Sequence, residues 1–413
     1  MVTETASNPT SSGVRAFTGP RRASHGAGFW IVAIAFVVAM AFCTVPTPLY
    51  PLYQQRDGFA TSMITVIFAA YAVGVMASLY LAGHVSDWLG RRSVILVSVL
   101  VEALSAVLFL LWSDPAGLIV ARFISGVGIG ALTATATAHL AELRAVARPE
   151  ENSGWANTVA TVVNTGGLAL GPIIGGVLAQ YVIAPLTVPY LVFLGLLIVS
   201  AIGVAFVPET IERAEERPAY RPQRISLPPD ARGRFFAAAV GAAAAFSVFG
   251  VFTSLTATFV SGTLHVTSHV AAGAIVFGVM GAAAAAQLLF GRTAARRKLL
   301  WGVLLMAGGL LGIAASSLLL SIALFVVAGV VSGAGVGLVF GSAIGVAASL
   351  APVDRRGEVL AGMFLWAYAG LTVPVVAVGI ALSYFGAQEV MIAFSFAVLI
   401  VVVISGVAML KRR

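Results

Sequence analysis

Twelve long apolar runs, separated by short polar connections, constrain the fold of this chain more than any other feature. A helix needs about 20 apolar residues to cross a membrane. The runs are long and show no apolar–polar alternation, which favours membrane helices over a barrel. The predicted spans are residues 29–49, 61–83, 93–113, 116–140, 153–180, 187–207, 235–259, 270–290, 299–318, 320–349, 357–383 and 388–410.

Few charges lie between these runs. Charged residues make up 10% of the chain and apolar residues 60%, whereas a soluble domain carries about 25% charge. So few charges cannot cover the surface of a soluble chain of this length. The lipid bilayer is therefore the expected solvent and the first predicted partner.

The positive residues predict which way the spans run. If the N-terminus is cytoplasmic, 22 of the 24 Lys and Arg residues fall in the tails and in loops on that side. Arg56 alone faces the other side, and Arg122 lies within a span. This positive-inside pattern predicts an inner-membrane protein with both termini in the cytoplasm. The net charge of +8 then reflects topology, so nucleic-acid binding is not expected.

A polar stretch divides the spans into two sets of six. Residues 208–234 hold five acids, six arginines and several prolines, which is typical of a cytoplasmic linker. The predicted organisation is an N-terminal bundle at 29–207 and a C-terminal bundle at 235–410. The flanking tails are 1–28, which is predicted to be disordered, and 411–413.

The two bundles carry related sequences. Ser125-Gly-Val-Gly-Ile-Gly130 in the fourth span returns as Ser332-Gly-Ala-Gly-Val-Gly337 in the tenth, and Pro172 and Pro374 lie deep in the fifth and eleventh spans. Such spacing indicates a duplicated six-helix unit. Parallel repeats of this kind build one class of secondary transporter, with its site between the halves.

Three motifs make a family resemblance specific. The turn Gly83-His-Val-Ser-Asp87-Trp-Leu-Gly90-Arg91-Arg92 follows the second span. The fourth span contains Arg122-x3-Gly126, and the fifth contains Gly167-x3-Gly171-Pro172-x2-Gly175-Gly176. On these motifs the chain resembles the major facilitator superfamily over residues 29–410, and its fifth span is similar to that of drug:proton antiporters. Trp88 departs from the turn motif, where relatives usually carry a basic residue.

The resemblance implies an all-α fold of twelve transmembrane helices in two pseudo-symmetric bundles. It implies that the turn, and Asp87 above all, forms a latch against helix eleven in the outward-open state. The turn residues concerned are Gly83, Asp87, Gly90, Arg91 and Arg92. The alternative is an ordinary loop acid beside two topology-fixing arginines.

Two ionisable residues lie within the spans and are candidates for a proton or charge relay. Arg122 needs a partner or water, because a cation inside a membrane costs several kcal/mol. Glu102 lies on a face with Ser98 and Ser105, which predicts that it points at protein. Loss of hydration there would favour its protonated form. A structural ion pair or a structural carboxyl is the alternative for each.

Polar and aromatic residues on several spans are candidates to contact cargo. Pockets for small molecules are mostly apolar with a few polar groups, although such aromatics often only pack or face lipid. The Gly167–Gly176 motif is expected to seal the outer half of the cavity through a bend at Pro172, and general packing of small residues is the alternative. The cavity candidates are Thr133, Asn157, Thr161, Asn164, Phe249, Thr253, Trp366 and Tyr368.

The sequence lacks a phosphate-binding Gly-x4-Gly-Lys-Ser/Thr motif, a metal-ligand cluster and a hydrolytic triad. We therefore expect no enzyme activity, no catalytic residues, no cofactor and no metal. The predicted function is export of small amphipathic or drug-like cargo by proton antiport with alternating access, with small-molecule cargo and protons as partners and a monomer as the working unit. The alternatives are uptake of a sugar or organic acid on the same fold, or a membrane scaffold.

Overall fold

The computed structural model describes residues 22–82, 85–151, 154–211, 231–351 and 356–411, and within these ranges it contains helices and no strand. Twelve helical segments in this part are long and apolar enough to cross a membrane. The first six segments comprise α1 (His25–Phe42), η1 (Thr47–Leu49) and α2 (Tyr50–Asp57), then α3 (Thr61–Ala82), α4 (Ser86–Leu89), α5 (Arg91–Leu111), α6 (Pro115–Ala147), α7 (Gly154–Tyr181) and α8 (Val188–Ala205). The last six are α9 (Arg232–Gly262), α10 (His269–Leu289), α11 (Ala295–Leu319), α12 (Ile322–Leu350), α13 (Arg356–Ala381) and α14 (Ala387–Leu410).

The first span differs from the continuous helix predicted at 29–49. The α-helix α1 ends at Phe42, and a turn and the short helix η1 separate it from α2. Pro46 lies in the turn and Pro48 in η1. A proline has no N–H and cannot bond the carbonyl one turn back, so these two prolines prevent the regular helix from continuing here.

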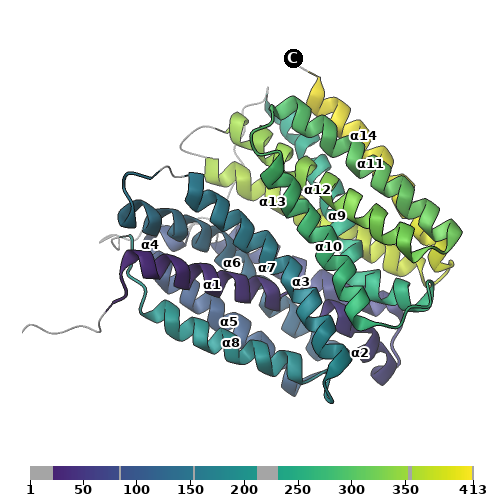
Figure 1. Ribbon diagram of the computed structural model, residues 1–413, viewed down its shortest axis with the longest axis horizontal. Coiled ribbons are helices and arrows are strands. Elements are labelled where there is room, and N and C mark those ends of the chain that lie inside the picture. Colours follow the sequence, from purple (N-terminus) through teal and green to yellow (C-terminus); the bar gives the residue numbers. More distant parts are fainter. Residues whose placement is uncertain (1–21, 83–84, 152–153, 212–230, 352–355, 412–413) are drawn as a thin grey trace, which may run out of the picture.

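The two sets of six spans pack as two bundles (Figure 1), the first at the lower left and the second at the upper right. One apolar core lies within the first six spans, and two further clusters lie mainly within the last six. The bundles meet where α7 packs against α10 and α3 packs against α13. Because the number of spans is even, both termini emerge on one side, which we name the terminus side; the opposite side is the far side.

The bundles touch on the far side. The Gln180 side chain near the end of α7 accepts a hydrogen bond from the backbone N–H of His269 at the start of α10, at 3.0 Å. A side chain at Gly379 of α13 would collide with Thr65 of α3. Both contacts lie near far-side helix ends, so this arrangement is closed there.

Candidate functional site

The glycines of the fifth-span motif let α7 approach α1 closely. Gly167, Gly171 and Gly175 recur every four residues and therefore lie on one side of the helix. A Cβ atom at Gly171 would collide with the Ala41 carbonyl and the Thr44 hydroxyl, and one at Gly175 would lie 2.6 Å from the Val45 carbonyl. These three glycines form a line, named here the glycine line, that fits α7 onto helix one.

The rest of the motif faces the other bundle. A Cβ atom at Gly176 would lie 2.5 Å from the His269 carbonyl of α10. In return, a side chain at Gly273 of α10 would collide with the Pro172 carbonyl. One motif thus holds α7 between α1 and α10, and its second contact forms the far-side closure.

Arg122 lies at the break of helix one. Its side chain is buried, and one guanidinium nitrogen donates to the Cys43 carbonyl oxygen at the end of α1. The guanidinium carbon lies 4.5 Å from the ring centre of Tyr71 and 5.7 Å from that of Phe68. A cation is favoured at a helix C-terminus and over an aromatic face. The break therefore supplies Arg122 with a partner that an unbroken helix would not offer.

Glu102 is fully buried between α5 and α6, and its oxygens have unequal surroundings. Oε2 accepts a hydrogen bond from Ser125 Oγ at 2.9 Å, whereas Oε1 has no hydrogen-bond partner. Oε1 lies against Gly128, where a Cβ atom would come within 2.6 Å of it. No ion pair joins Glu102 to Arg122 in the described part of the chain. The two relay candidates thus contact different partners.

The polar stripe of α7 lies between the bundles. By the helical repeat, Asn157, Thr161 and Asn164 fall in the sector between the glycine line and the residues that contact α10. Asn157 is exposed, and Thr161 and Asn164 are partly exposed. The same sector is buried farther along the helix, at Ala179. The bundles therefore part toward the terminus side and present these polar side chains there.

Five aromatic side chains of the second bundle form a partly exposed group, named here the aromatic cluster. Neighbouring ring centres within it lie 4.7–6.0 Å apart, and Phe249 also packs against a small cluster of Ala169 of α7 with Val276 and Met280 of α10. The members are Phe246 and Phe249 of α9, Phe340 of α12, and Phe364 and Tyr368 of α13. The sequence analysis missed Phe340 and Phe364 as cavity candidates; only their contacts with Phe246 and each other reveal them.

The other cavity candidates lie elsewhere. Trp366 is two residues from Tyr368, so it falls on another side of α13, where it is exposed and meets Phe236 edge to face. Thr253 is buried and its hydroxyl donates to the carbonyl of Phe249 in its own helix. Thr133 is partly buried and donates to Ile129 in the same way, at 2.8 Å. The structure therefore brings Tyr368 and Phe249 together, but not Trp366 or Thr253.

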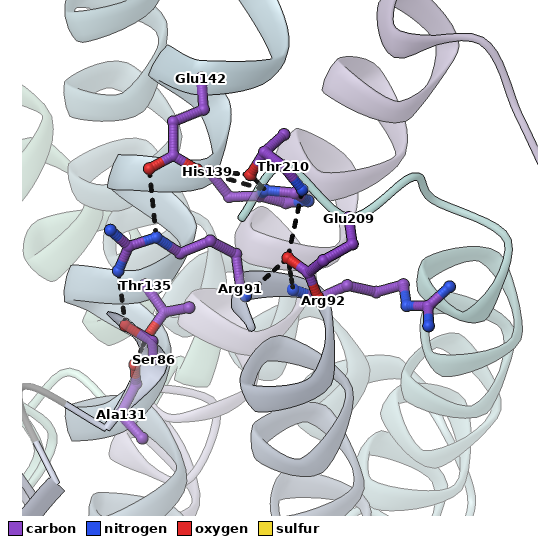
Figure 2. Close-up of polar contacts among 9 residues, drawn as sticks. All are labelled: Ser86, Arg91, Arg92, Ala131, Thr135, His139, Glu142, Glu209 and Thr210. Carbon is purple, nitrogen blue, oxygen red and sulfur yellow. Dashed lines mark hydrogen bonds and ion pairs between the residues drawn. The ribbon is translucent and has the colours of Figure 1, made fainter. Parts of the chain in front are cut away.

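A second group of polar residues lies on the terminus side, around the start of α5 (Figure 2). Arg91 Nε donates to Glu142 Oε1 at 3.2 Å, and the backbone N–H of Arg91 donates to Glu209 Oε1 at 2.8 Å. Glu209 also accepts from the backbone of Arg92 and so satisfies N–H groups at the helix start. Gly90 has φ +95°, which favours glycine, and a side chain there would strike the Glu209 carboxylate. We name Arg91, Glu142, Glu209, Thr210 and His139 the turn cluster.

The hydrogen bonds of the turn cluster define one histidine tautomer. Thr210 gives its single hydroxyl proton to Glu142 Oε2. Its oxygen must then accept from His139 Nδ1, 2.9 Å away, so Nδ1 carries the proton in the neutral ring. These hydrogen bonds, with those of Glu209, hold the segment after α8 against α5 and α6. Sequence reasoning missed Glu142 and Glu209; the only signal was the acid of Pro208-Glu209-Thr210 at the end of the sixth span.

The predicted latch is only partly visible. Gly83 and the side chain of Asp87 lie outside the described residues, so the latch role of Asp87 stays a prediction. The cluster contacts given above all join elements of the first bundle.

The fold and these motifs define a membrane transporter. The family model of the Major Facilitator Superfamily matches residues 32–373, and the chain belongs to this superfamily. The puromycin resistance protein pur8 of Streptomyces alboniger is 30% identical over 154 residues, 37% of this chain and 30% of that protein. The quinolone resistance protein NorA of Staphylococcus aureus is 26% identical over 133 residues, 32% of this chain and 33% of NorA. The chain thus matches about a third of the length of these relatives.

Solved structures share the fold over nearly the whole chain. The nucleoside transporter NupG aligns with a TM-score of 0.70 at 11% identity, covering 93% of this chain and 100% of NupG. The human organic anion transporter MFSD10 aligns with a TM-score of 0.69 at 16% identity, with the same two coverages. A bacterial homologue of the lysosomal transporter Spinster, solved facing inward and unoccupied, aligns with a TM-score of 0.69 at 12% identity, covering 94% of this chain and 96% of that one.

Proposed function

We propose that this transporter exports small amphipathic, drug-like compounds by proton antiport with alternating access. The terminus side is then the cytoplasmic side of the inner membrane, and the structure corresponds to the inward-facing state. The observation that carries the proposal is the fifth-span motif, whose glycine line and Pro172 contacts hold α7 between α1 and α10. Two of the relatives are named as resistance proteins, which supports export as the direction.

The chemistry between the bundles supports the cargo class. One wall carries amide and hydroxyl groups on α7, and the other carries the aromatic cluster. Neither the stripe nor the cluster contains an ionised side chain. An apolar, aromatic wall with a few polar groups suits a flat amphipathic compound better than a sugar or an anion.

We further propose Glu102 as the proton-binding group. It lies near the middle of α5, and its Oε1 can accept a proton without losing the Ser125 hydrogen bond on Oε2. Arg122 would act as the fixed positive charge one helical turn from Ser125. Among the described residues of α1 and α2, the one acid is Asp57, at the far-side end.

The test is transport into everted membrane vesicles that contain the protein, with puromycin, a fluoroquinolone and a cationic dye as probes. A pH gradient, acidic inside, is imposed in the absence of ATP. We expect uphill accumulation of at least one probe and its loss when an ionophore collapses the gradient, with vesicles lacking the protein as the control. Uphill accumulation that persists without any ion gradient would overturn the proton-coupled mechanism.

A second candidate is uptake of a hydroxyl-bearing compound, such as a sugar or an organic acid. The polar stripe of Asn157, Thr161 and Asn164 favours it, because amides suit hydrogen-bonded cargo. The two candidates differ in direction. Uptake predicts accumulation of such a compound in right-side-out vesicles and none of the three probes in everted ones.

A further inference from the structure

The fifth span contains a carbonyl group that lacks its usual donor four residues later in the helix. In an α-helix each carbonyl accepts from the N–H four residues later. For Leu168 that residue is Pro172, which has no N–H. A carbonyl within a membrane bundle needs another donor, because neither lipid nor a packed interior supplies one.

Thr44 of helix one supplies that donor. Its hydroxyl oxygen lies 3.0 Å from the Leu168 carbonyl oxygen, and Thr44 is buried. The hydroxyl also lies 3.1 Å from the Ala41 carbonyl of its own helix. That carbonyl already accepts from the backbone N–H groups of Thr44 and Val45. Leu168 is therefore the acceptor that depends on the Thr44 hydroxyl.

Thr44 occupies the turn where helix one is broken, next to the residue that holds Arg122. The Cys43 carbonyl accepts from the Arg122 guanidinium, and the following hydroxyl donates to α7. Cys43 and Thr44 thus link the buried cation of α6 to the carbonyl of α7 that Pro172 leaves without its usual donor. On its other side, the Pro172 carbonyl meets Gly273 of α10 in the second bundle.

We propose that Thr44 is a positioning residue for the far-side closure. Its hydroxyl holds α7 at Pro172, so that the motif residues meet α10 and the far side stays closed. This role concerns the conformational equilibrium alone. It requires neither the proposed cargo nor proton coupling, so its test is independent of the transport assay.

The test compares Thr44→Ala with Thr44→Ser, which differ only by the hydroxyl group, since both lack the γ-methyl group of threonine. A single cysteine probe is placed at Val276 of α10, which is buried beside Ala169 of α7. Labelling of Val276→Cys by a maleimide is followed in purified, detergent-solubilised full-length protein. The parent protein, with its buried Cys43, gives the background.

We expect Thr44→Ala to raise the labelling rate about three- to tenfold, the range that one interhelical hydrogen bond in a membrane protein supports. Thr44→Ser should label like the parent. A second probe, Asn157→Cys, reports the terminus side, where Asn157 is exposed. Its labelling should fall as that of Val276→Cys rises. General loosening of the protein would raise both rates.

Pro172→Ala makes the test specific. Residue 172 then regains an N–H that can bond the Leu168 carbonyl, so Thr44→Ala should add no further change in that background. If Thr44→Ala alone fails to fold, the double variant should restore a folded, monodisperse protein. The proposal is overturned if Thr44→Ala labels like the parent. It is also overturned if Thr44→Ala changes the labelling rate equally whether residue 172 is proline or alanine, or if the double variant stays unfolded.

Discussion

Two buried ionisable side chains in the first bundle are accommodated by different means. The Arg122 cation has a carbonyl at a helix end and two aromatic faces. Glu102 has one hydroxyl donor and no ion pair in the described residues. A carboxylate buried without a counter-charge is costly, so this surrounding favours a carboxyl that carries a proton. The charge of Arg122 can thus stay fixed while that of Glu102 changes.

Glu102→Gln should uncouple transport without unfolding the protein. Glutamine matches the shape of a protonated glutamate and can still accept from Ser125, so we expect a change in the free energy of unfolding below about 1 kcal/mol. Accumulation driven by a pH gradient should be lost, while downhill flux of the same probe remains. Both are measured in proteoliposomes.

The matched control is Ser105→Ala at the same helix interface. The Ser105 hydroxyl donates to the Ala121 carbonyl at 2.8 Å, and its loss perturbs packing between α5 and α6 without touching a titratable group. This control should stay coupled. Gradient-driven accumulation by Glu102→Gln at the wild-type rate would remove Glu102 from the mechanism.

At the scale of a helix, α7 is shaped by where it lacks side chains. The glycine line allows contact with α1, while Gly176 and Pro172 meet α10. Close backbone approach through small residues is a common way to pack membrane helices. Gly166 lies next to the line, yet nothing is within 4 Å of a Cβ atom built there. Neighbouring glycines in one helix therefore have opposite tolerance to a methyl group.

Gly171→Ala should lower the thermal stability of the protein, and Gly166→Ala should not. The methyl group at position 171 would strike the Ala41 carbonyl and the Thr44 hydroxyl, so α7 must shift. Overpacking of this kind costs about 1–3 kcal/mol, whereas alanine at position 166 gains up to about 1 kcal/mol of helix propensity. Thermal melting in detergent measures the difference. Equal melting temperatures for the two variants would show that the glycine line is not a close contact.

Sequence patterns predict the elements of this fold better than they predict the side-chain contacts. The span count follows from the lengths of the apolar runs, because lipid leaves few alternatives to a helix. Pro46 and Pro48 could in principle indicate the break in helix one, whereas the length of the apolar run predicts a continuous helix. Hydropathy averages over a window and cannot register where a helix loses its hydrogen bonds.

Contacts between distant segments were beyond the sequence analysis. Glu142 lies near the end of α6 and Glu209 follows α8, and the two acids meet only around Arg91 and Thr210. Trp366 and Tyr368 are two residues apart, and the helical repeat sends them to different surroundings. Which side of a membrane helix faces protein is not encoded by hydropathy when both sides are apolar.

At the scale of the molecule, the two bundles are joined on the far side and part toward the terminus side. A transporter that alternates between states must open this far-side contact. Joining the bundles there with a covalent link should therefore stop transport, whatever the cargo.

The predicted cross-link uses Gln180→Cys and His269→Cys, whose parent residues are hydrogen-bonded between the bundles. A short thiol-reactive cross-linker should abolish uphill transport, and a reductant that cleaves it should restore transport. The control pair is Arg56→Cys and Ser113→Cys, joined by a hydrogen bond of 3.1 Å within the first bundle. Cross-linking the control pair should leave transport intact. Undiminished transport with the 180–269 link in place would contradict the closed far side.

The far-side contact is built from uncharged groups, including several glycine backbones. Within the described residues it includes glycine contacts and the Gln180–His269 hydrogen bond, and none of the ion pairs of those residues joins the bundles there. Dissolved ions screen the attraction between exposed charges over about 8 Å at physiological ionic strength, but they do not weaken contact between neutral backbones. The closure should therefore hold equally well in dilute and in concentrated salt.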